Sequence, residues 1–188
     1  PEAQTVLVFH TNSGSCPAEF LPITLKPQDL GLAAAGTFPR PEPDYAGKRA
    51  LDLNAFEPAL AAFDDQRRAE LDKLLAGATL LDIQALLSEG RFTSEELVTY
   101  YVDRIQRYDV DKLNSVMELD PAALEQARAL DAERSAGNVR GPLHGIPILL
   151  KDNIAVAGGL HATAGAWALR NWQPDRDAFL AQRLRQTG

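Results

Sequence analysis

From residue 54 onward, apolar side chains recur at spacings of three and four residues, the period of one face of an α-helix. The positions that carry this stripe are Phe56, Ala59, Leu60, Phe63, Leu71, Leu74 and Leu75. We therefore predict helical structure from Asn54 to Leu75, and Gly77 then supplies a stop, because glycine is common just after a helix end.

Two further helices are predicted by their end signals. Thr79 precedes a run of leucine and isoleucine at helical spacing, and Gly90 closes that run. Thr93-Ser94-Glu95-Glu96 has the form of a capping box, in which the threonine and Glu96 each bind a free backbone amide. The apolar positions that follow it predict a helix of about four turns.

The second half of the chain mixes helix and strand signals. Leu113–Leu119 is short and apolar-rich, and Ile146–Leu150 is a continuous apolar run after turn-rich sequence, so both predict strands, the second buried on both faces. Asp120-Pro121 predicts the start of a helix that runs to about Ala136. Asp177 is expected to cap a last helix. This order of elements predicts an α/β fold.

The first fifty residues lack helical periodicity. Seven of the twelve prolines lie at or before Pro43, and each proline pushes its predecessor toward extended geometry. Within this part, Thr5–Phe9 predicts a short strand. The sequence therefore predicts a Pro-rich extended leader over 1–53 and an α/β domain over 54–188.

Composition narrows the class of protein. The chain has 188 residues, a formal net charge of −7 and one cysteine. We expect no transmembrane helix, since no run of about 18 apolar residues occurs, and no internal disulfide. The acidity argues against a nucleic-acid or anionic-membrane binder. Cytoplasmic and processed secreted or periplasmic locations both stay open, with the cytoplasm favoured.

The candidate chemistry lies in Gly141–Asn153, which reads GPLHGIPILLKDN. Lys151 ends the predicted buried strand, and burying a cation is costly. Two interpretations stand side by side: Lys151 emerges at the strand end and pairs with a carboxylate, or desolvation leaves a neutral amine that acts as a base. Strand alternation places Asp152 on the opposite face from Lys151, so Asp152 is not expected to neutralise it directly.

This stretch resembles the amidase signature family, together with TAGAWAL at 163–169 and PDRDAFLAQRLRQTG at 174–188. The resemblance extends over roughly 80–188 and is nearest to peptide-amidase-like members. It implies a mixed central sheet covered by helices, of which this chain supplies the helices and first strands. It also implies amide hydrolysis through a Ser–cis-Ser–Lys triad, without metal or cofactor, on a small amide or peptide-amide substrate. The lysine of the triad corresponds to Lys151.

The sequence departs from the family pattern in one respect. The family's two catalytic serines follow the lysine, whereas this chain has no serine after Ser135. We therefore expect the N-terminal portion of an amidase that is inactive alone and self-associates or binds a companion chain. The alternative is a non-catalytic binding or assembly module derived from the amidase fold. Ser13, Ser15 and Cys16 are interpreted as loop, and the pair of Cys16 with His10 as unrelated residues. His144 and His161 have no metal-ligand spacing, and Trp167 and Trp172 are interpreted as packing or interface aromatics.

Overall fold

The computed structural model describes residues 5–6, 23–24 and 50–188. The chain divides into two compact units, Pro1–Lys48 and Arg49–Gly188. In the first unit, β1 (Thr5–Val6) pairs antiparallel with β2 (Ile23–Thr24). The strand predicted from Thr5 is thus confirmed over its first two residues. Most of the predicted leader over 1–53 lies outside the described residues, and the boundary at 53/54 stays a prediction.

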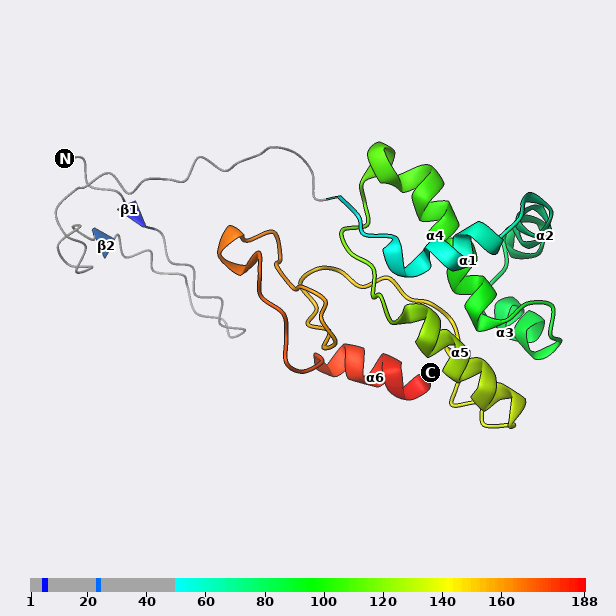
Figure 1. Ribbon diagram of the computed structural model, residues 1–188. Helices are drawn as coiled ribbons and strands as arrows, with labels where there is room; N and C mark the ends of the chain where they lie inside the picture. The colour runs from blue at the N-terminus through cyan, green and yellow to red at the C-terminus, as the bar shows by residue number, and fades with distance from the viewer. Residues whose placement is uncertain (1–4, 7–22, 25–49) are drawn as a thin grey trace. The chain divides into compact units, whose positions relative to one another are not determined.

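The second unit is helical (Figure 1). Its α-helices are α1 (Glu57–Ala62), α2 (Asp65–Leu75), α3 (Leu80–Ser88), α4 (Ser94–Tyr108), α5 (Ala123–Ser135) and α6 (Phe179–Thr187). Short turns of other helix types are η2 (Asn54–Phe56), η3 (Asp109–Leu113) and η4 (Trp167–Leu169). The predicted helices are present, but the stretch Asn54–Leu75 is interrupted at residues 63–64. The predicted start at Asp120-Pro121 is wrong, since α5 begins at Ala123 with Ala122 at its N-cap position. No described helix is long and apolar enough to cross a membrane.

Both ends of α3 and the start of α4 follow the predicted local chemistry. At the start of α4, the Thr93 hydroxyl accepts from the Glu96 amide at 3.1 Å, and the Glu96 carboxylate accepts from the Thr93 amide at 3.1 Å. Thr79 and Asp82 form the same box on α3. Gly90, just past α3, adopts a φ of +69°, which a residue without a Cβ tolerates best.

Helix α4 carries the core, because two apolar clusters pack against it. The first cluster joins α4 to α2 and α3 and comprises Phe63, Leu71, Leu87, Phe92, Leu97 and Tyr100. The second joins α4 to α1 and α5 and comprises Phe56, Val98, Val102, Leu124 and Ala127. The long, strongly patterned helix is therefore the scaffold on which α1, α2, α3 and α5 are arranged (Figure 1).

A largely buried ion pair fixes α2 to α4. The Arg68 guanidinium donates to both carboxylate oxygens of Asp103, at 2.9 and 3.1 Å, and Arg107 donates to the same carboxylate at 3.1 Å. The hydrogen bond from Arg68 to Asp103 raises the pKa of the guanidinium despite its desolvation. Because Asp103 is only 5% exposed, both partners are needed to make its burial tolerable.

The two strands predicted in the second half are wrong. Residues 114–120 carry no regular structure, because the Asp109 carboxylate accepts from the amides of Ser115 (2.7 Å) and Val116 (3.0 Å). The Asp109 side chain thus binds two backbone N–H groups that would donate to a neighbouring strand if this segment were part of a sheet. Ile146–Leu150 is also irregular, and Leu149 is 72% exposed. A strand needs a hydrogen-bonded neighbour, and no part of 50–188 pairs with this segment.

The mixed central sheet expected from the resemblance is consequently not confirmed. Within the described residues, the sheet structure consists of β1 and β2. The expected cap of the last helix is also wrong. Ala178 occupies the N-cap position of α6, whereas the Asp177 carboxylate accepts from the Ala157 amide at 2.7 Å and pairs with Arg185 at 2.9 Å. Asp177 therefore ties α6 to a preceding loop instead of capping it.

The capping box on α4 provides a first prediction. Replacing Thr93 by Ala is expected to lower the free energy of unfolding by about 1 kcal/mol, because the Glu96 amide loses its acceptor. Chemical denaturation monitored by circular dichroism measures the change. Thr99→Ala is the control, since its hydroxyl donates to the Glu95 carbonyl inside the same helix and caps nothing. An unchanged midpoint for Thr93→Ala would contradict the capping role.

Candidate active-site segment

The segment that carries the candidate chemistry leaves α5 and is anchored at His144. The imidazole is fully buried, with Nε2 2.9 Å from the Leu130 carbonyl and Nδ1 3.3 Å from the Arg140 amide nitrogen. A backbone amide only donates and a carbonyl only accepts, so the partners assign the neutral tautomer with its proton on Nε2. His144 is thus a buried residue whose ring is hydrogen-bonded on both nitrogens.

The backbone of His144 connects three parts of the unit. Its carbonyl accepts from Gln84 of α3 and from Arg134 of α5, both at 2.9 Å. Arg134 also donates to the Gln84 side-chain oxygen at 3.0 Å. The loop that begins the GPLHGIP stretch is therefore held against both helices. Among the described residues, no cluster of three or more His, Cys, Asp or Glu has the arrangement of a metal site.

Gly145 lies against the start of α4. The Asp131 carboxylate of α5 accepts from the amides of Ser94 (2.7 Å) and Glu95 (3.1 Å), which holds the first turn of α4 in place. The fully buried Ser94 side chain then faces Gly145 so closely that a Cβ on Gly145 would lie 2.1 Å from its hydroxyl oxygen. This approach, together with a φ of +77°, explains why glycine occupies the position.

Lys151 is exposed, immediately before a turn at Asp152 and Asn153. Its carbonyl accepts from the Ile154 amide at 2.9 Å. Within residues 50–188 no ion pair joins its ammonium group to a carboxylate. The expected position at the end of a buried strand is wrong, because Ile146–Leu150 forms no strand here. The catalytic role of Lys151 stays a prediction.

Asp152, the neighbour of Lys151, binds elsewhere. Its carboxylate accepts from the Thr163 amide at 2.9 Å and from the Thr163 hydroxyl. Burial raises the pKa of Asp152, but the hydrogen bonds from Thr163 and from the amides of Gly165 and Ala164 outweigh it and hold the pKa below its usual value. The sequence expectation that Asp152 does not neutralise Lys151 agrees with this pairing.

This lowered pKa gives an acid-stability prediction. A carboxyl whose pKa is lower in the folded state stabilises the fold above its unfolded pKa of about 3.9. That stabilisation is lost as the pH falls through the folded pKa. We therefore expect Asp152→Asn to show a smaller loss of unfolding free energy between pH 5 and 2 than the unmodified chain, measured by urea denaturation. Equal slopes would contradict the contribution of Asp152.

The other sequence candidates do not gather around Lys151. The His161 ring contacts Glu118 through Nδ1 at 2.9 Å, and the Glu118 carboxylate also accepts from the His161 amide at 2.8 Å. Trp172 is partly exposed, and the Trp167 side chain lies outside the described part of the structure. The leader candidates at positions 10, 13, 15 and 16 also lie outside the described residues.

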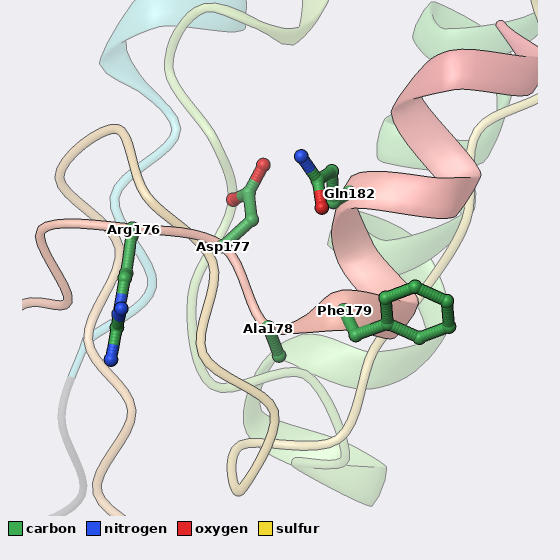
Figure 2. A pocket seen from close by; sticks show the side chains of 5 residues that line it. All are labelled: Arg176, Asp177, Ala178, Phe179 and Gln182. Atoms are coloured by element: carbon green, nitrogen blue, oxygen red, sulfur yellow. The ribbon is translucent and has the colours of Figure 1, made fainter.

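An open pocket of about 530 Å³ lies at the start of α6 (Figure 2). It is lined by Arg176, Asp177, Ala178, Phe179 and Gln182. Figure 2 shows the Arg176 and Phe179 side chains pointing apart from one another. Because the one carboxylate of this lining already binds Arg185 and a backbone amide, the pocket brings together no group that we assign to catalysis.

The hydrogen bonds from Thr163 to the Asp152 carboxylate were not predicted from the sequence. Both residues stand in the quoted motifs, Asp152 in GPLHGIPILLKDN and Thr163 in TAGAWAL. The two motifs therefore contained both partners: Asp152 stands next to Lys151, and Thr163 begins TAGAWAL. Nothing in helical or strand periodicity indicates that these two motifs meet.

Both the sequence and the fold of this chain are similar to those of amidases. Residues 96–188 match the family model described as Amidase. A protein named as an amidase in Schizosaccharomyces pombe is 39% identical over 61% of this chain and 19% of its own length. A glutamyl-tRNA(Gln) amidotransferase subunit from Salinispora arenicola is 34% identical over 61% of this chain and 23% of its own length. The predicted resemblance to the amidase signature family is confirmed.

Solved structures agree with the sequence matches. An amidase family protein from Bacillus anthracis is 35% identical, with a TM-score of 0.66 over 72% of this chain and 27% of that chain. The peptide amidase from Stenotrophomonas maltophilia is 44% identical, with a TM-score of 0.55 over 59% of this chain and 23% of that chain. The chain thus spans less than a third of the length of these relatives.

Proposed function

We propose that this chain is the lysine-bearing part of an amide hydrolase that acts on small amides or peptide amides through a Ser–cis-Ser–Lys triad. The observation that carries the proposal is the position of Lys151 inside the region that matches the amidase family. The two serines lie outside this sequence, since none follows Ser135. The chain by itself is then inactive.

Lys151 acts in this proposal as the proton acceptor. A neutral amine takes a proton through the bridging serine, and the nucleophilic serine attacks the amide carbonyl. Backbone amides near the nucleophile stabilise the oxyanion, and water then cleaves the acyl-enzyme. Removal from water favours the neutral form of an amine, so the proposal requires that the complete protein covers Lys151. Leu149, 72% exposed, lies two residues before it and is an apolar surface suited to being covered.

The relatives help to choose between two amide chemistries. Hydrolysis of a simple amide and transfer of an amide nitrogen by an amidotransferase both begin with amide cleavage. The peptide amidase from Stenotrophomonas maltophilia, at 44% identity, supports the hydrolase. An assembly module without catalytic activity has no observation in its favour among the described contacts.

The test is expression of the complete reading frame, followed by assays on peptide amides, simple linear amides and glutamine. We expect ammonia release from the first two classes and little from glutamine. Phenylmethylsulfonyl fluoride should label a serine located beyond residue 188. If a stop codon follows Gly188 directly, or if the complete protein hydrolyses none of these amides, the proposed function is wrong.

A further inference from the structure

The strongest unassigned feature is the pair formed by Asp152 and Thr163 beside the candidate lysine. Thr163 is 7% exposed and donates to the carboxylate through both its amide and its hydroxyl. The Thr163 hydroxyl oxygen accepts in turn from the Gly165 amide at 3.1 Å. The Ala164 amide donates to the Asp152 carbonyl at 3.3 Å. Three hydrogen bonds thus close the loop that starts immediately after Lys151, and the fourth holds the Thr163 hydroxyl from within its far end.

The loop is also fixed along its length. The Ile154 amide binds the Lys151 carbonyl at 2.9 Å, so the backbone on both sides of the Lys151–Asp152 bond is tied. The Ala162 amide binds the Trp172 carbonyl at 3.2 Å. These bonds leave the Asp152 side chain directed at Thr163, while Lys151 itself is exposed. An anchored backbone with a projecting amine is an arrangement suited to presenting that amine to another group.

We propose that the Asp152–Thr163 pair is the positioning element for Lys151. The carboxylate does not touch the reacting atoms; it fixes the peptide from which the amine projects. This inference rests on the proposed function, since positioning matters only if Lys151 acts as the base. Its physical basis is that a displacement of about 1 Å in a catalytic group can cost 10²-fold in rate.

Three variants of the complete protein separate positioning from mere folding. Asp152→Asn keeps the size of the side chain but turns an NH₂ group toward a hydroxyl whose oxygen already accepts from Gly165. Thr163→Val removes the hydroxyl at nearly constant shape, and Thr163→Ser restores it. We expect the Asp152→Asn and Thr163→Val variants to lose about tenfold or more in kcat with KM within about twofold. The Thr163→Ser variant should keep most of its kcat.

The chain contains a matched control in a second loop. The Asp109 carboxylate accepts from the Ser115 amide and hydroxyl, which repeats the chemistry of the Asp152–Thr163 pair at another place in the sequence. Ser115→Ala should therefore cost stability much as Thr163→Val does. Its kcat, measured on folded protein, should equal that of the unmodified enzyme. A kcat loss of equal size in Ser115→Ala would overturn the positioning role.

Amide hydrogen exchange on the 188-residue chain gives a readout without catalysis. Asp152→Asn should speed exchange at Thr163, Ala164 and Gly165, while Ser115→Ala leaves these amides unchanged. Unchanged exchange in Asp152→Asn, or full kcat in both Asp152→Asn and Thr163→Val, would overturn the inference. If the unmodified complete protein has no amidase activity, the proposed function fails, and the positioning role fails with it even where exchange changes as expected.

Discussion

Replacing Lys151 by Ala in the complete protein is expected to lower kcat by about 10²–10⁴-fold, the usual contribution of a positioned general base. The helical unit should persist, because within residues 50–188 the Lys151 side chain makes no ion pair with a carboxylate. The measurement is steady-state hydrolysis of a peptide amide, with unfolding midpoints compared in parallel.

Lys151→Arg sharpens this prediction. Arginine keeps the positive charge and the length of the side chain but stays protonated at every working pH, so it cannot accept a proton. We expect Lys151→Arg to be as inactive as Lys151→Ala. Lys73→Ala is the matched control, since Lys73 is another exposed lysine, in the last turn of α2. Activity close to that of the unmodified enzyme in either Lys151 variant would exclude Lys151 as the base.

The helices were predictable because their signals are local. The capping box at Thr93 and Glu96 involves residues three positions apart, and Gly90 lies just past the end of α3. The apolar stripe of α4 indicates the buried face only in part: Val98 and Val102 are buried, whereas Tyr101 and Tyr108 of the same stripe are exposed. A segment of about four residues, roughly one helical turn, contains all the information that such features need.

The strands could not be predicted in the same way. Ile146–Leu150 has the composition of a buried strand, but a strand forms only when another segment supplies its hydrogen-bonded partner. Nothing within 50–188 does so, and Leu149 is exposed instead of buried. Composition shows that a segment is able to form a strand, whereas the presence of a hydrogen-bonded neighbour decides whether it does so.

In the candidate site, too, a motif of neighbouring residues was recognisable from the sequence and contacts between distant residues were not predictable. The motif supplied Lys151 as the candidate, whereas the strand alternation used to separate Asp152 from it does not apply, because the segment forms no strand and Asp152 lies in a turn. The bond from Thr163 to Asp152 joins positions 11 residues apart across an irregular loop. Its existence depends on the path of the loop, including the left-handed Ala164, φ +49°, and Gly165, φ +74°. The spacing of apolar residues along the sequence does not predict the conformation of an irregular loop.

Gly145→Ala is expected to give the largest loss of stability among the substitutions considered. The new methyl group would lie 2.1 Å from the Ser94 hydroxyl oxygen and 3.0 Å from the Ser94 Cβ. Ser94 is fully buried in the first turn of α4, where Asp131 holds its amide, so it has little room to move. The φ of +77° adds a backbone cost of about 1–2 kcal/mol, and overpacking adds about 1–3 kcal/mol.

Gly137→Ala separates these two costs. Gly137 has nearly the same φ, +79°, but a Cβ there would meet nothing within 4 Å. We expect Gly137→Ala to lose only the backbone part, about 1–2 kcal/mol, and Gly145→Ala to lose the sum of both parts. Denaturant unfolding of both variants measures the difference. Equal losses would show that Ser94 yields to the methyl group, and that the close packing of the GPLHGIP loop on α4 does not constrain this position.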